Sequence, residues 1–236
     1  MDKALTQLVE KLQKAYGDRL VSVVLYGSAA AGDHHPGFSD TNVLCVLSEI
    51  TSRQLGAGED VFRWWREQGS PSPLLLTEQE VVTSTDCFAI EFSDIKRQHQ
   101  LLFGRDVITS LVVDHTFYRA QVEHDLRAKL LRLRQKASGM LSNGDLLRRL
   151  LLDSVSTFCV LFRHALILHG VEAPGLKREV VARAAEQFGF DPQACNQLLD
   201  VREKRIKPRD LAPVAVLDAF LHCISLVIDA VDRLEK

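Results

Sequence analysis

The hydrophobic pattern of this chain changes near residue 110, and that change limits the folds that it can adopt. Before this point, short apolar runs of strand length alternate with amphipathic segments of helical length. The runs that predict strands are residues 21–26, 42–47, 74–76 and 87–92. Residues 2–16 and 51–68 predict helices, and Thr77 with Glu80 has the spacing of a capping box at the start of a short one. Alternating strands and helices predict an α/β layer.

After about residue 114 helical periodicity takes over. Apolar residues recur there at spacings of four, four, three and four, as Val122, Leu126, Leu130, Leu133 and Ala137. Residues 146–168 are apolar almost all round, which is typical of a central bundle helix, and further helices are predicted at 177–188, 192–202 and 213–234. The sequence therefore predicts an α+β protein with a mixed-sheet α/β domain over residues 1–112 and an all-α helical bundle over residues 113–236.

Composition limits the partners and the compartment. The formal net charge of −2 gives no global attraction to nucleic acid or to an anionic membrane, so a nucleic-acid partner would need a local basic patch. The five cysteines are scattered and lie among apolar neighbours, which is typical of buried thiols in a reducing compartment. We expect a cytoplasmic protein with no membrane partner, and homo-oligomerisation stays open.

The stretch LYGSAAAGDHHPGFSDTNVL, residues 25–44, follows the first predicted strand and leads into the second. Gly27 lets the backbone approach a phosphate closely, and the hydroxyl of Ser28 can donate to its oxygens together with the amides of the turn. Asp40 comes just before the second strand, where a carboxylate can hold a divalent cation against that phosphate. The stretch therefore predicts a turn that binds phosphate and metal.

Gly27-Ser28, a gap of eleven residues and then Asp40-Thr41-Asn42 resemble the signature of the nucleotidyltransferase superfamily, which includes DNA polymerase beta and the kanamycin-type aminoglycoside nucleotidyltransferases. By this resemblance Ser28 binds the triphosphate and Asp40 is the first metal carboxylate. The family's third acid comes from a later, adjacent strand, and FAIEFSD offers Glu91 there, with Asp94 as the alternative. The resemblance thus implies that Asp40 and Glu91 are catalytic.

Asn42 departs from the family pattern, which has Asp or Glu at this position. The resemblance implies Mg²⁺ or Mn²⁺ held by Asp40, Asn42 and Glu91, but an asparagine oxygen brings a dipole and no charge. A unit charge about 4 Å from a cation is worth about 4 kcal/mol at an effective dielectric constant of about 20. We therefore expect one bound ion instead of two, with catalysis weakened or lost.

Three functions follow from these observations. The first is transfer of a nucleoside monophosphate from a nucleoside triphosphate to a hydroxyl acceptor, which the sequence leaves open between an aminoglycoside, a protein side chain and an RNA end. The second is a catalytically inactive nucleotide-binding or regulatory protein of the same fold. The third places the activity in the bundle, because Arg163 and His169 fit the loose spacing of the HEPN ribonucleases.

Overall fold

A computed structural model describes residues 3–30 and 41–234, apart from the side chain of Ser28. The chain divides into two compact units after Phe117. The division predicted after residue 112 lies in the segment between Gly104 and Tyr118 that joins the last strand to the first bundle helix.

The first unit is built on a four-stranded mixed sheet with the strand order β3-β2-β1-β4. The strands are β1 (Leu20–Tyr26), β2 (Asn42–Leu47), β3 (Leu74–Thr77) and β4 (His99–Gly104). β1 is antiparallel to both of its neighbours, and β2 is parallel to β3. The mixed sheet confirms the predicted fold class, and three of its strands lie where the apolar runs predicted them.

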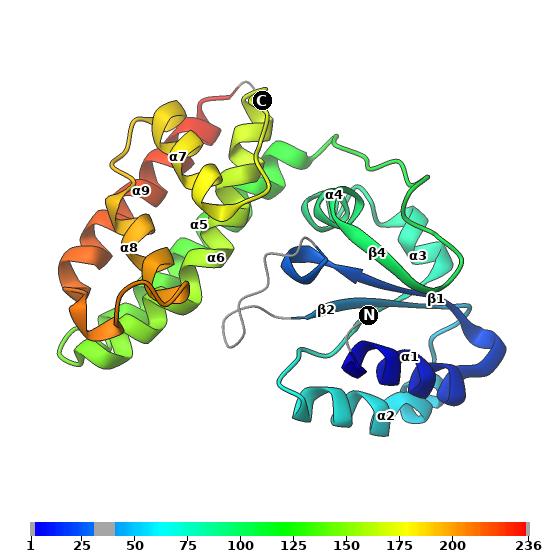
Figure 1. The fold of residues 1–236 in the computed structure, drawn as a ribbon. Helices are drawn as coiled ribbons and strands as arrows, with labels where there is room; N and C mark the ends of the chain where they lie inside the picture. Colours follow the sequence, from blue (N-terminus) through cyan, green and yellow to red (C-terminus); the bar gives the residue numbers. More distant parts are fainter. Residues whose placement is uncertain (1–2, 31–40, 235–236) are drawn as a thin grey trace. The chain divides into compact units, whose positions relative to one another are not determined.

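Helices cover both faces of this sheet (Figure 1). They are α1 (Lys3–Tyr16) and α2 (Ser52–Glu67) on one face, and α3 (Glu78–Thr83) and α4 (Ala89–Arg97) on the other. Because successive strand residues point to opposite faces, β1 contributes to two separate cores. Val23 and Leu25 pack with α1 and α2, whereas Val24 and Tyr26 pack with α4.

The capping box predicted at Thr77 is present at the start of α3. The amide of Glu80 donates to Oγ1 of Thr77 at 3.1 Å, and the amide of Thr77 donates to Oε2 of Glu80 at 2.7 Å. The hydrogen bonds that the amide and the hydroxyl of Thr77 donate to Oε2 of Glu80 lower the pKa of this carboxyl group. The box confirms that α3 begins directly after β3.

The strand predicted at residues 87–92 is wrong, because that segment leads into α4, and the strand β4 that follows it was missed. The buried residues Ala89, Phe92 and Ile95 recur every three positions, which is the spacing of a helix face. Six residues are too few for an apolar run to distinguish a helix from a strand by its period. The helix forms because this face packs on the sheet beside Val24 and Leu44.

All the regular secondary structure described for the second unit is helical, as predicted. Its helices are α5 (Tyr118–Ser138), α6 (Gly144–Leu168), α7 (Lys177–Phe188), α8 (Gln193–Arg202) and α9 (Pro213–Asp232). All five residues of the predicted α5 stripe are buried, and α6 is the central helix, whose Phe158 and Phe162 contact the rings of Phe220 and Phe190.

Two helices, α6 and α9, are long and apolar enough to cross a membrane by length and composition alone. Of their most apolar windows, 67% and 44% respectively are buried inside the protein. The core helix of a bundle passes the same test, so these two helices are weak grounds for a membrane span.

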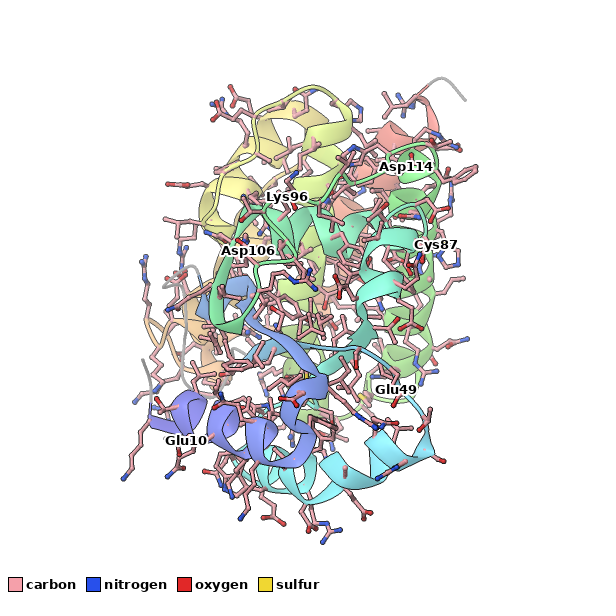
Figure 2. All side chains as sticks on the ribbon, turned by 90° about the vertical axis from the view of Figure 1, so that its right-hand side faces the viewer. Glu10, Glu49, Cys87, Lys96, Asp106 and Asp114 are labelled. Atoms are coloured by element: carbon pink, nitrogen blue, oxygen red, sulfur yellow. The ribbon has the colours of Figure 1, made fainter. Side chains whose placement is uncertain are left out.

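A carboxylate organises the segment that follows β4. Asp106 accepts hydrogen bonds from the amides of Ile108 and Thr109, both at 2.9 Å, and from the Thr109 hydroxyl at 2.6 Å. Lys96 of α4 donates to the carbonyl oxygen of Leu111 in the same segment, and Figure 2 labels Lys96 and Asp106. The hydrogen bonds from Thr109 and Ile108 lower the pKa of Asp106 from 3.8 to about 2.

We expect Asp106→Asn to lower the thermal unfolding midpoint at pH 7. Because folding lowers this pKa, the stabilisation is present above the unfolded value of 3.8 and is lost as the pH falls from about 4 to about 2. Thermal melts followed by circular dichroism at pH 7, 4 and 3 should therefore show the two proteins converging. Asp60→Asn, at a side chain that is 92% exposed on α2, is the control. A difference that persists unchanged to pH 3 would contradict this assignment.

Candidate functional site

The Gly-Ser turn lies at the carboxyl end of β1. Gly27 opens the short 3-10 helix η2 (Gly27–Ala29) with φ of +76°, a conformation that glycine adopts at little cost. Its carbonyl oxygen accepts from the amide of Ala30 at 3.0 Å, and its own amide donates to the carbonyl oxygen of Gln98 at 3.4 Å. The turn is therefore tied to the residue that immediately precedes β4.

Asn42 is the first residue of β2 and lies beside this turn. Strand pairing places it opposite Tyr26. Its Nδ2 atom is 3.3 Å from the position that a Cβ on Gly27 would occupy. The side-chain amide of Asn42 can lie this close because residue 27 is a glycine. The residue expected at the second carboxylate position of the resemblance thus packs against the Gly-Ser turn.

Glu91 lies in the first turn of α4 and not on a strand. Burial raises the pKa of Tyr26, and the negative charge of Glu91 raises it further, so Glu91 lies within electrostatic range of the end of β1. The positive end of the helix dipole also favours an acid in this turn. Glu91 therefore lies within range of the strand end that precedes the Gly-Ser turn. Its position in the first turn of a helix also favours an acid, whether or not it binds a ligand.

His99, the first residue of β4, lies beside the end of β1 and was not among the residues that the sequence predicted for the site. Strand pairing places it opposite Tyr26, on the other side from Asn42. Its Nδ1 lies 3.0 Å from the carbonyl oxygen of Ile95 in α4. The run HQLLFG has the length of a strand and ends in glycine, so it could have predicted β4. It was not assigned as a strand because the strand predicted at residues 87–92 lies just before it.

Two predicted site groups, Asp40 and the side chain of Ser28, lie outside the described residues, so their roles stay predictions. Within residues 3–30 and 41–234, no group of three His, Cys, Asp or Glu side chains is arranged to hold a metal ion. Asn42 and Glu91 offer hard oxygen donors, which suit Mg²⁺. These two residues fit a magnesium ion only as part of a set that another ligand, such as Asp40, completes.

The pair that suggested RNA cleavage lies in two different surroundings. Arg163 is 7% exposed and lies within the carboxyl-terminal part of α6. His169 follows the end of that helix, with Nδ1 2.8 Å from the carbonyl oxygen of Ala165 and its ring against Phe188 at 5.0 Å between centroids. A cleavage site needs both groups on one substrate-facing surface, and this arrangement gives no support for one.

Comparison with protein families decides the class of the first unit. The family model described as a nucleotidyltransferase domain matches residues 5–129, which is more than half of the chain. The chain belongs to this nucleotidyltransferase domain family. The matched residues include all four strands and the Gly-Ser turn. No curated protein matches the sequence.

Solved structures show that the likeness of fold extends over the whole chain. The spectinomycin adenyltransferase AAD(9) from Enterococcus faecialis, crystallised with ATP and spectinomycin, superposes with a TM-score of 0.61 over 97% of this chain and 98% of that chain. At 13% identity, this match shows the fold alone. A toxin-antitoxin structure with AMP-PNP covers 42% of this chain and 73% of that chain at 17% identity, with a TM-score of 0.31.

We expect Gly27→Ala to destabilise the protein by more than 1 kcal/mol in urea unfolding. Left-handed backbone costs an L-residue about 1–2 kcal/mol, and the new Cβ would also crowd the Asn42 amide at 3.3 Å. Gly17→Ala is the matched control, because Gly17 has φ of +54° with nothing within 4 Å of the added Cβ. Equal losses for the two variants would mean that the Asn42 contact contributes nothing.

Proposed function

We propose that this protein transfers a nucleoside monophosphate from a nucleoside triphosphate to a hydroxyl acceptor and releases pyrophosphate. The observation that carries the proposal is the Gly27 turn at the end of β1 with Asn42 packed against it at the start of β2. Membership of the nucleotidyltransferase domain family supports the reaction class. The shared fold with a structure that holds ATP and spectinomycin supports a nucleotide and an acceptor as the two ligands.

The chain's own groups would divide the work between phosphate and metal. The Ser28 hydroxyl and the amides of the turn would hold the triphosphate, and the φ of +76° at Gly27 directs the backbone into this turn. Asp40, Asn42 and Glu91 would hold Mg²⁺ or Mn²⁺. When bound, such an ion would neutralise the charge that develops on the departing pyrophosphate.

The alternative is a protein that binds nucleotide without turning it over. The neutral side chain of Asn42 beside the Gly-Ser turn favours it, because the site then has one negative charge fewer with which to hold cations. Both functions use the same turn and differ in whether a metal is retained strongly enough for chemistry.

The experiment that separates them uses α-labelled ATP with Mn²⁺ and follows the label into the adenylylated product together with the release of pyrophosphate. The acceptors are first water and then spectinomycin, a model protein and an RNA oligonucleotide. Product formation that Asp40→Ala abolishes establishes transfer. Calorimetric binding of ATP without product establishes the inactive alternative. Absence of any effect of ATP and Mn²⁺ on the melting temperature rules out both.

We expect Asn42→Asp to bind Mn²⁺ at least about ten-fold more tightly, which corresponds to about 1.4 kcal/mol. The added charge is worth several times that before screening by solvent. Gln100→Glu is the matched control, because Gln100 pairs with Leu25 at the same end of the sheet as Asn42 but on its opposite face. Titration of Mn²⁺ by electron paramagnetic resonance measures both. Equal tightening in the two variants would show that the effect is one of general charge and not of the site.

A further inference from the structure

Three neighbouring strands have residues side by side at the point where the Gly-Ser turn begins. Asn42 of β2 and His99 of β4 both stand opposite Tyr26, the last residue of β1. Directly opposed residues of antiparallel strands share a face, and neighbouring strands lie about 4.8 Å apart. The backbones of Asn42 and His99 are therefore about 10 Å apart on the α4 face of the sheet, with Tyr26 between them.

The imidazole of His99 is held in one tautomer. The partner of its Nδ1 is the carbonyl oxygen of Ile95, at 3.0 Å, and a carbonyl oxygen only accepts hydrogen bonds. Ile95 is itself 1% exposed, so α4 packing fixes the acceptor in place. In the neutral ring Nδ1 thus carries the proton, and Nε2 carries the lone pair that can receive another.

A backbone hydrogen bond, in addition to strand pairing, ties the segment before His99 to the Gly-Ser turn. The amide of Gly27 donates to Gln98, the residue directly before His99. His99 as a whole is half-buried. The carboxylate of Asp106 lies within electrostatic range of His99.

We propose that His99 is the general base of the transfer reaction. The inference rests on the proposed function and names the group that activates the acceptor. The acceptor oxygen forms a bond to the α-phosphorus while the bond from that phosphorus to the bridging oxygen of the β-phosphate breaks. Pyrophosphate leaves with the electron pair, and the proton of the acceptor hydroxyl passes to Nε2 of His99. Glu91, on α4, is then left to bind metal and not to accept the proton.

The test compares His99→Asn with the wild-type protein in pyrophosphate release from ATP with Mn²⁺, using spectinomycin and water as the acceptors. The asparagine amide can donate to Ile95 as Nδ1 does, but it offers no basic nitrogen. We expect kcat to fall by about 10²–10⁴-fold, a typical contribution of general base catalysis, with the Kd for ATP and the melting temperature unchanged. His115→Asn, at the exposed histidine whose Nε2 lies 3.1 Å from Oγ of Ser93, is the control and should keep its activity.

A second variant separates proton transfer from positioning. If Nε2 is the base, imidazole added to His99→Ala should restore part of the lost kcat, whereas a purely structural loss would not respond. Full activity in His99→Asn, or a loss in His99→Ala that imidazole leaves unchanged, would overturn the assignment while the proposed function stands. Wild-type protein that releases no pyrophosphate with any acceptor would instead end the proposed function, and the base assignment with it.

Discussion

The position of β1 in the centre of the sheet determines most of the first unit. Val23 and Val24 are both fully buried although they point to opposite faces, so the strand is covered on both sides. It is hydrogen bonded along both edges, to β2 and to β4. Where β1 ends, three chain segments that are distant in sequence must therefore end or begin together. The Gly-Ser turn, Asn42 and His99 are neighbours for this reason.

Much of this arrangement can be predicted because its signals are strong and local. β1 and β2 are nearly continuous apolar runs between polar segments. The long helix α5 has apolar residues at spacings of three and four, which the two-residue period of a strand cannot produce. The Gly-Ser turn is visible because Gly27 must take a backbone conformation that other residues rarely adopt. In each of these cases the local preference and the tertiary environment agree.

Residues 87–104 resisted prediction for the opposite reason. β4 is an edge strand whose residues are all at least partly exposed, so it lacks the apolar run that identified β1. The preceding segment has the apolar content of a strand but packs as a helix on the sheet. Because the strand was assigned to residues 87–92, Glu91 was expected on a strand, whereas it lies in the first turn of α4, and His99 was not considered. Only the register of β4 with Tyr26, which the sequence does not reveal, places His99 beside the end of β1.

In the proposed reaction, Asn42 and His99 would both act on the same group, the attacking hydroxyl of the acceptor. A site with fewer carboxylates holds cations less strongly and lowers the pKa of a bound hydroxyl less. A hydroxyl whose pKa stays higher is less acidic and needs a stronger proton acceptor, and a neutral imidazole is a stronger base than a carboxylate. A histidine also accepts a proton without requiring a buried negative charge in the resting site. In the proposed reaction, Asn42 and His99, which stand on either side of Tyr26, would therefore together allow the transfer with less negative charge in the site.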